Sequence, residues 1–351
     1  MHQEFWKGKR VLVTGHTGFK GGWLSLWLRS LGADVFGVAL PPLTSPNFFE
    51  VADIGGVVHS HMVDIRDLGA LRARVKEIRP ECAFHLAAQP LVRLSYQDPV
   101  GTFSTNVLGT VHVLEALREV SSLLSAVVVT SDKCYENREW AWGYRESDPM
   151  GGHDPYSGSK GCTELVTASY GHSFFQGADA ARIATARAGN VIGGGDWSPD
   201  RLVPDVLRSF SEGKPVVLRY PEAIRPWQHV LEPLGGYLEL ARQLATGAQK
   251  GGGGWNFGPK ESDVRTVLEV VEALARHWGG KAEYRVESAG QPHEAGLLKL
   301  DCSKASRHLG WRPKMDLDRA LALTVAWHKA WAHSANMTRL TREQLEEYQN
   351  L

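Results

Sequence analysis

The feature that most constrains the fold is a glycine-rich turn near the N-terminus, within RVLVTGHTGFKGGWL (residues 10–24). An apolar run precedes the turn, and leucines at helical spacing follow it. Gly15, Gly18 and Gly21 have GxxGxxG spacing. The first glycine permits a tight turn, the second lets a pyrophosphate approach the backbone, and the third lets the helix pack against the strand. This context predicts a dinucleotide-binding βα unit; a tight turn without a ligand is the alternative.

Apolar runs and helical patterns alternate through the first half of the chain. Helical stretches such as LGALRARVKEIR and NVLGTVHVLEALREV separate most of the runs. The alternation predicts βαβ units in a parallel sheet with helices on both faces, a doubly wound α/β fold of the Rossmann type. The expected strands are 10–15, 34–40, 56–64, 82–88 and 125–131.

The pattern changes near residue 190, where GNVIGGGDWSPDR is glycine-rich and irregular. The chain then ends in amphipathic helical patterns such as LDRALALTVAWHKAWA. Its 351 residues are enough for one large domain or two smaller ones. We expect a dinucleotide-binding domain at 1–189, to which 227–258 return, and a smaller C-terminal α/β substrate-binding region made of 190–226 and 259–351.

The composition argues against several kinds of partner. Lys+Arg and Asp+Glu are balanced at 39 each, so no overall charge attracts nucleic acid or an anionic membrane. The four cysteines have no CxxC spacing, the N-terminus lacks the apolar core of a signal peptide, and no apolar run approaches the roughly 18 residues of a membrane span. These features predict a soluble cytoplasmic protein with reduced thiols. No cluster has metal-ligand spacing, and His59 and His61 fit a half-exposed strand, so no metal is predicted.

The choice of dinucleotide depends on the second expected strand, which ends in GVALPP. The acid that usually binds the adenine ribose is missing there, because Asp34 stands at the beginning of that strand. No arginine or lysine follows to bind a 2′-phosphate, so NAD is favoured over NADP. Asp64, after the third strand, could hydrogen-bond the adenine amino group or cap the next helix.

The segment TSDKCYENREWAWGYRESDPMGGHDPYSGSKG (130–161) combines an acid, a base and a Tyr/Lys pair. Tyr156 and Lys160 are four residues apart, which puts both on one face of a helix. A phenol with a pKa near ~10 is a poor base at neutral pH, but a neighbouring ammonium and a nicotinamide cation both favour the phenolate. The pair predicts a tyrosine general base; an amphipathic surface pair is the alternative.

With these motifs the chain resembles the extended short-chain dehydrogenase/reductase family over nearly its whole length. The resemblance rests on TGHTGFKG, HLAAQ (85–89), NVLGT (106–110), Ser131 and YSGSK. It implies that Ser131 hydrogen-bonds the reacting sugar hydroxyl, that Tyr156 removes its proton, and that Lys160 holds the nicotinamide ribose. The NAD contacts that it implies are Gly15, Thr17, Gly18, Phe19, Lys20, Gly21, Asp64, Ile65, Leu86, Ala87, Ala88, Gln89, Asn106, Tyr156 and Lys160.

The adjacent Asp132 and Lys133 resemble the nucleotide-sugar 4,6-dehydratases of this family, which are lyases. In that reaction hydride passes from C4 to NAD, the 4-ketone acidifies the C5 proton, water leaves across C5 and C6, and the hydride returns to C6. The resemblance implies Asp132 as the acid that helps the C6 hydroxyl to leave and Lys133 as the base at C5. The related dTDP-glucose enzymes have a glutamate in place of Lys133. Such a pair can exchange roles by proton transfer, and a solvated loop pair is the alternative.

Further segments, among them AAQPLVRLSY, GGGDWSPDRLVPD, RPWQHVLEPL and PHEAGLLKLD, resemble the branch of these dehydratases that acts on CDP-glucose. This implies CDP-glucose as the substrate, with Asn190 and Arg225 at its diphosphate and Arg201 near the nucleotide. Surface ion pairs are the alternative for these arginines. The remaining substrate contacts that it implies are Gln89, Ser131 and His293, the last in a loop that closes on the substrate.

The resemblance also implies a homodimer formed through helices at about 100–120 and 155–175. Four tryptophans at helical spacing, Trp23, Trp27, Trp327 and Trp331, fit the core or an interface better than a cofactor contact. Two other functions remain open at this point. A nucleotide-sugar 4-epimerase would use the Ser/Tyr/Lys group without the Asp–Lys pair, and a non-catalytic NAD-binding sensor would be expected to lack the Tyr/Lys pair.

Overall fold

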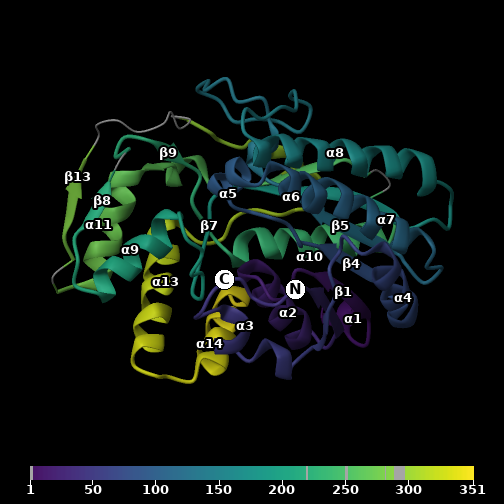
Figure 1. Ribbon diagram of the computed structural model, residues 1–351, viewed down its shortest axis with the longest axis horizontal. Helices are drawn as coiled ribbons and strands as arrows, with labels where there is room; N and C mark the ends of the chain where they lie inside the picture. Colours follow the sequence, from purple (N-terminus) through teal and green to yellow (C-terminus); the bar gives the residue numbers. More distant parts are fainter. Residues whose placement is uncertain (1–2, 219, 250–251, 281, 288–296) are drawn as a thin grey trace.

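The central element of the computed structural model is a seven-stranded parallel sheet with the strand order β11-β6-β5-β4-β1-β2-β3 (Figure 1). The structure describes residues 3–218, 220–249, 252–280, 282–287 and 297–351. The sheet strands are β1 (Arg10–Thr14), β2 (Asp34–Ala39), β3 (His59–Met62), β4 (Cys82–His85), β5 (Ser125–Val129), β6 (Arg182–Ala188) and β11 (Gly254–Phe257).

Helices follow most of these strands. The α-helices are α1 (Gln3–Trp6), α2 (Phe19–Ser30), α3 (Phe48–Val51), α4 (Leu68–Ile78), α5 (Val92–Gln97), α6 (Pro99–Phe103), α7 (Gly109–Arg118), α8 (Pro155–Phe174), α9 (Leu202–Ser211), α10 (Leu231–Ala245), α11 (Val267–Trp278), α12 (Ser303–His308), α13 (Leu317–Ala332) and α14 (Met337–Gln349). Short helical turns are η1 (Ile54–Gly56), η2 (Ser104–Leu108), η3 (Asp132–Cys134) and η4 (Glu261–Asp263).

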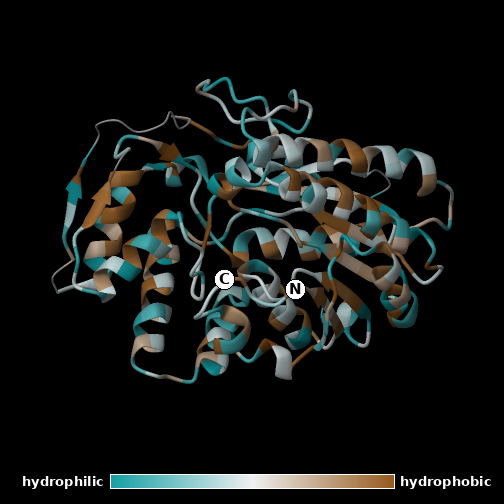
Figure 2. Ribbon diagram, viewed as in Figure 1, coloured by the Kyte–Doolittle hydropathy of each residue, from teal (hydrophilic) through white to brown (hydrophobic). Residues whose placement is uncertain are grey.

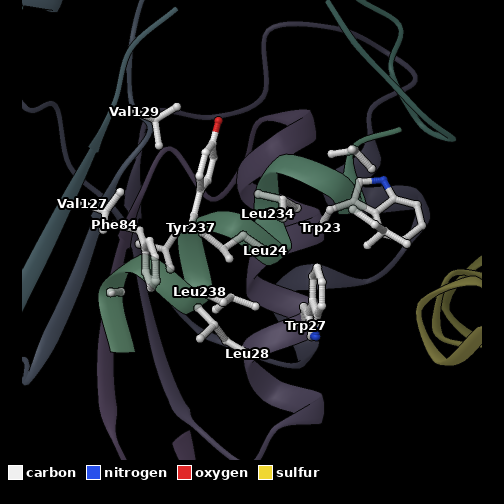
Figure 3. Close-up of a cluster of buried hydrophobic side chains, with 14 of the residues drawn as sticks. Trp23, Leu24, Trp27, Leu28, Phe84, Val127, Val129, Leu234, Tyr237 and Leu238 are labelled. Carbon is white, nitrogen blue, oxygen red and sulfur yellow. The ribbon is translucent and has the colours of Figure 1, made fainter. Parts of the chain in front are cut away.

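Side chains alternate between the two faces of the sheet, as the two-residue period of a strand requires. Val127 and Val129 point into the cluster formed with α2 and α10, whereas Ala126 and Val128 point into the cluster formed with α4 and α7. Figure 3 shows the first cluster, where Tyr237 of α10 lies next to Phe84, Val127 and Val129 of the strands. The central strands are hydrophobic in Figure 2, because both of their faces are covered.

A second apolar cluster lies beside the sheet and is built from α9, α11 and α13. Three short pairs of strands accompany it or link it to the sheet: β7 (Val191–Ile192) with β10 (Gln228–His229), β9 (Ile224–Arg225) with β12 (Arg265–Thr266), and β8 (Val216–Leu218) with β13 (Tyr284–Val286). The C-terminal helix α14 returns to the larger cluster, where Tyr348 packs edge-on against Trp27. The regions near the two chain ends are therefore neighbours in the fold (Figure 1).

The predicted Rossmann-type sheet is confirmed, with differences at some boundaries. The expected strand at 56–64 is shorter, since residues 54–56 form η1 and β3 begins at His59. The helical pattern after residue 104 is interrupted by a π-helical turn, η2. The tryptophan prediction is confirmed for Trp23, Trp27 and Trp327, which are fully buried. No helix in the described ranges is long and apolar enough to cross a membrane.

Candidate active site

The glycine turn lies between the carboxyl end of β1 and the start of α2. Gly15 has a φ of +78°, and a Cβ on it would lie 2.7 Å from the backbone nitrogen of Ala87. A Cβ on Gly21 would lie 2.0 Å from the carbonyl oxygen of Gly15, so helix and turn touch backbone to backbone. Gly18 is the N-cap of α2 and is exposed. The turn therefore presents bare backbone and a helix N-terminus to the crevice at the carboxyl edge of the sheet, which fits a dinucleotide pyrophosphate.

The residues predicted around the adenine end lie on the same edge of the sheet. Thr17 is buried and donates its hydroxyl to the carbonyl of Leu40 at 2.8 Å. The Asp64 carboxylate is bound by the Arg66 guanidinium, which lowers the pKa of Asp64. The alternative that Asp64 caps the next helix is wrong, because Asp67 is the N-cap of α4 and accepts from the Ala70 amide at 3.0 Å. Ile65 is buried under Gly109.

The segment after β4 is held by hydrogen bonds to its neighbours. The amides of Leu86 and Ala87 both donate to the Thr14 hydroxyl at 3.2 Å, which places this segment beside the glycine turn. Ala88 and Gln89 continue along the edge. Asn106 accepts from the Gln89 amide at 2.8 Å and donates to the Ser159 hydroxyl at 2.8 Å, so it connects this segment to α8. The Asn106 side chain is therefore hydrogen-bonded to other protein groups.

Ser131, Tyr156 and Lys160 are brought together at the carboxyl end of β5. Tyr156 and Lys160 both lie on α8, as their spacing predicts, and all three side chains are buried. Burial raises the pKa of Tyr156 to about 12, while the Ser131 hydroxyl bonded to the phenol and the Arg201 guanidinium lower it. Burial lowers the pKa of Lys160 to about 8, against a raising effect of Glu164. The expectation of a readily ionised phenol is therefore only partly met, because burial outweighs the nearby donors.

Asp132 and Lys133 begin η3, directly after Ser131. Asp132 is only 3% exposed, so the alternative of a solvated loop pair is wrong for this residue, whereas Lys133 is half-buried. The Ser131 hydroxyl donates to Asp132 Oδ1 at 3.0 Å, and Asp132 Oδ2 has no hydrogen-bond partner in the described part of the chain. Burial raises the pKa of Asp132, opposed by Lys133, Ser131 and Arg225. A carboxyl group buried in this way keeps its proton to a higher pH than an exposed aspartate does, which suits an acid catalyst.

A glycine makes room for this carboxyl group. A Cβ on Gly189 would lie 2.8 Å from Asp132 Oδ2 and 2.6 Å from Pro226 Cγ. The turn after β6 and the turn after β9 therefore meet at the acid, which brings two segments of the second half of the chain to the same site.

Three residues predicted to bind the substrate, Asn190, Arg201 and Arg225, come from the second half of the chain. Asn190 is half-buried, and its carbonyl accepts from the Gln228 amide at 3.0 Å. Arg225 is close enough to Asp132 to lower the pKa of that carboxyl. Arg201, at the N-cap of α9, lies 3.5 Å from Asp196, and its charge lowers the pKa of both Tyr156 and Lys20. Lys20 donates to the Tyr237 hydroxyl at 3.4 Å, and burial lowers the pKa of Lys20 to about 7. His293 lies outside the described residues.

Two charged residues close to this group were missed by the sequence reasoning. Glu164 and Arg187 form a buried ion pair at 2.8 Å, with side chains 6% and 4% exposed. A signal was present in both cases. Glu164 follows Lys160 by one helical turn, and Arg187 is a charge in the strand pattern RIATARA, where a buried strand should carry none without a partner. In the described residues no group of three or more His, Cys, Asp or Glu side chains could hold a metal ion.

Comparison with known proteins assigns the class first. A family profile described as GDP-mannose 4,6 dehydratase matches residues 12–324. The fold and the Ser/Tyr/Lys group define an extended short-chain dehydrogenase/reductase, and the chain belongs to the GDP-mannose 4,6 dehydratase family within it.

Individual proteins show how similar the chain is to particular enzymes of this class. A CDP-glucose 4,6-dehydratase of Salmonella typhimurium is 52% identical over 350 residues, covering 99% of this chain and 98% of that protein. A dTDP-glucose 4,6-dehydratase of Xanthomonas campestris is 28% identical, covering 90% and 92%. Among solved structures, a UDP-glucose 4-epimerase of Thermus thermophilus in complex with NAD has a TM-score of 0.78 at 26% identity, covering 91% of this chain and 98% of that one.

Proposed function

We propose that this chain is a CDP-glucose 4,6-dehydratase that converts CDP-D-glucose to CDP-4-keto-6-deoxy-D-glucose and water. The observation that carries the proposal is the 52% identity to the Salmonella typhimurium CDP-glucose 4,6-dehydratase, which extends over 99% of the chain. The enzyme is a hydro-lyase that uses NAD, which is regenerated in each turnover. NAD, when bound, accepts the hydride from C4 and donates it to C6.

The site residues divide between two tasks. Tyr156 takes the proton of the C4 hydroxyl as hydride leaves C4, while Ser131 hydrogen-bonds the same hydroxyl. Lys160 holds the nicotinamide ribose. The phenol must lose its proton for this step. Burial raises the pKa of Tyr156 to about 12, and the Ser131 hydroxyl and Arg201 guanidinium oppose this rise.

The second task is the loss of water from C5 and C6. Asp132 donates a proton to the departing C6 hydroxyl, and Lys133 removes the proton at C5. The burial that raises the pKa of Asp132 supports the acid role, because the carboxyl group then keeps its proton at a higher pH. The ketone at C4 makes the C5 proton acidic enough for an amine base.

The binding residues are assigned on the same basis. The backbone of the glycine turn, with Thr17, Phe19 and Lys20 around it, holds the pyrophosphate of NAD, and Leu86, Ala87 and Ala88 lie along the cofactor. Asp64 and Ile65 lie at the adenine end. Gln89, Asn190, Arg201, Arg225 and His293 bind the nucleotide sugar. Gly15, Gly18 and Gly21 leave room for this arrangement, since two of them would clash with backbone if they carried a Cβ.

Three broader assignments complete the proposal. Residues 1–189 with 227–258 form the NAD-binding domain, and 190–226 with 259–351 the substrate-binding region, which is supported by the pairing of β11 with β6 and by the separate cluster around α9 and α11. The enzyme works in the cytoplasm, where nucleotide sugars are made and its free cysteines stay reduced.

The enzyme is also a homodimer. An apolar groove runs over α6, η2 and α8 and is lined by Pro99, Val100, Phe103, Ser104, Val107, Leu108, Val111 and Cys162. Val100 is 79% exposed and Leu165 on the neighbouring helix is 64% exposed, which a second copy of the same helices would cover. Val100→Glu should convert the dimer to a monomer in light scattering, whereas Val217→Glu, at an exposed position of β8 that does not line the groove, should not. A wild-type monomer would contradict this assignment.

A 4-epimerase is the second candidate, favoured by the fold similarity to a UDP-glucose 4-epimerase. An assay separates the two. The purified chain is supplied with NAD and, in separate reactions, with CDP-, dTDP-, UDP- and GDP-glucose. We expect an alkali-induced ultraviolet absorbance of a 4-keto product with CDP-glucose above the others. Formation of a C4 epimer without that absorbance would overturn the proposal.

A further inference from the structure

Glu164 is a buried carboxylate that the reaction does not use, yet its oxygens are fully engaged at the catalytic loop. Its Oε1 accepts from the Thr130 hydroxyl and from Arg187 Nε at 2.9 Å. Its Oε2 accepts from the Thr185 hydroxyl at 2.6 Å and from Arg187 Nη2 at 2.8 Å. Thr130 immediately precedes Ser131, so this carboxylate ties the upstream end of the loop to α8, one turn after Lys160.

Arg187 contacts the downstream end of the same loop, at Tyr135. Its Nη1 donates to the Tyr135 hydroxyl at 2.6 Å, and its guanidinium lies 5.0 Å from the centre of that ring. Tyr135 immediately follows η3 and passes the contact on, donating to Asn256 Oδ1 at 2.7 Å. All of these groups are buried. The ion pair therefore touches the residue before Ser131 and the residue after Cys134. It joins α8, which carries Glu164 and Tyr156, to β6, which carries Arg187.

We propose that Glu164 and Arg187 are a positioning pair, which clamps both ends of the Ser131–Cys134 loop against α8 and so fixes the acid–base group relative to Tyr156 and Lys160. The proposal rests on the proposed function. A dehydratase depends on this relative positioning more than an epimerase does. One bound sugar must contact Tyr156 at C4 and the Asp132–Lys133 pair at C5 and C6. An error of about 1 Å in such an arrangement can cost roughly 100-fold in rate.

Glu164 also raises the pKa of Lys160 through its charge. The titratable groups that face Lys160 are Tyr156 and Glu164 on its own helix, Cys134 in η3, His85 in β4 and Lys20 in α2. Burial raises the pKa of Cys134 and lowers the pKa of His85 to about 3, so both are neutral near pH 7. Glu164 has the larger effect of the two groups that raise the pKa of Lys160, ahead of Cys134. Removing its charge should let Lys160 lose its proton at a lower pH.

Four variants separate the two effects. Glu164→Gln removes the charge and keeps the shape, whereas Arg187→Lys keeps the charge and loses the forked contact. Thr130→Val and Tyr135→Phe each remove one hydroxyl, at the upstream and downstream ends of the loop. These last two changes are small enough to keep the fold even where the charged variants do not.

The measured quantities are kcat, KM, the pH profile, and the reduced-nicotinamide absorbance that builds up in a single turnover with CDP-glucose. We expect kcat to fall about 10- to 100-fold in the two charge-pair variants and about 3- to 10-fold in the hydroxyl variants, with KM within about threefold. Reduced nicotinamide should accumulate, because oxidation at C4 outpaces the loss of water. The alkaline limb of the profile should move to lower pH in Glu164→Gln and stay in place in Arg187→Lys.

Glu232→Gln is the matched control. Glu232 is equally buried and accepts from the amides of Lys314 and Met315 and from the Tyr348 hydroxyl, far from η3 in the chain. It should lose stability without accumulating reduced nicotinamide. Accumulation in the control equal to that in Glu164→Gln, or full kcat in folded Thr130→Val and Tyr135→Phe, would overturn the pair. The wild-type chain is assayed first, and its failure to convert CDP-glucose would contradict the proposed function instead.

Discussion

The loop after β1 and the loop after β5 lie on the same edge of the sheet, but the first presents backbone atoms to the site and the second presents side chains. In the first, larger residues are excluded by the backbone, since a Cβ added to Gly21 would lie only 2.0 Å from the Gly15 oxygen. The second presents side chains, and its Ser131, Asp132 and Lys133 depend on protonation and on a buried ion pair behind them. A site made of backbone binds by shape, whereas a site made of ionisable side chains performs proton transfers. Substitutions in the two loops should therefore fail in different ways.

The largest effects on reaction rate should come from substituting the proposed base Tyr156 and the proposed acid Asp132. Tyr156→Phe removes the base of the first stage, on whose ketone product the second stage depends, so we expect oxidation at C4 to fall at least roughly 1,000-fold. Asp132→Asn should leave that oxidation within about threefold while slowing water loss about 100-fold or more, because only the second stage needs the acid. Rapid-quench analysis of the sugar products measures the two stages separately. Equal loss of both stages in Asp132→Asn would show that the residue positions the substrate rather than donating a proton.

The glycine turn should respond to shape alone. Gly21→Ala forces a Cβ into the Gly15 carbonyl, and we expect a loss of about 2–3 kcal/mol in the free energy of unfolding together with a loss of NAD binding. Gly18→Ala is the matched variant, since its Cβ would meet only one atom, at 3.4 Å, in a backbone region open to alanine. It should keep the wild-type melting temperature and still weaken NAD binding in calorimetric titration. An unchanged NAD affinity in Gly18→Ala would remove the pyrophosphate from this turn.

The smallest effect concerns stability and pH. Burial raises the pKa of Asp132, so the folded protein holds this proton more tightly than the unfolded chain does. The stabilisation is fully present below the usual pKa of an aspartate and is lost as the pH rises through the raised pKa of the folded state. Asp132→Asn removes this dependence, so the variant should be more stable than the wild type by about 1 kcal/mol at about pH 8.

Urea denaturation at several pH values measures this difference, which should shrink as the pH falls toward about 4. Because the substitution at Gly18 removes no ionisable group, Gly18→Ala should show the same pH dependence as the wild type. A gap between Asp132→Asn and the wild type that widened toward acid would contradict the raised pKa.

The two loops also differ in how far the sequence could predict them. The βα unit around Gly15 follows from local patterns, an apolar strand, a turn and a helix, so its place in the sheet could be predicted. The position of Tyr156 and Lys160 on one helix face followed from their spacing in the same way. By contrast, the meeting of Gly189, Pro226 and Asp132 joins segments far apart in the chain, and no local pattern encodes it.

Electrostatic surroundings were the least predictable feature. The capping role that was left open as an alternative for Asp64 belongs to Asp67, which directly precedes the helix start at Leu68, while Asp64 pairs with Arg66. The phenol of Tyr156 was expected to ionise readily, and burial works against this. The Glu164–Arg187 pair was missed although both residues stand in telling positions. Each of these depends on burial and on neighbours from other strands, which become known only once the chain is folded.

The most direct test of the account follows the fate of one hydrogen. CDP-glucose with deuterium at C4 is converted with NAD present at far less than one equivalent, and the product is examined by mass spectrometry and NMR. The account predicts complete conversion, with the deuterium transferred to C6 and a solvent-derived hydrogen at C5. Conversion that stops when the NAD is used up, or deuterium that is lost to the solvent, would contradict it.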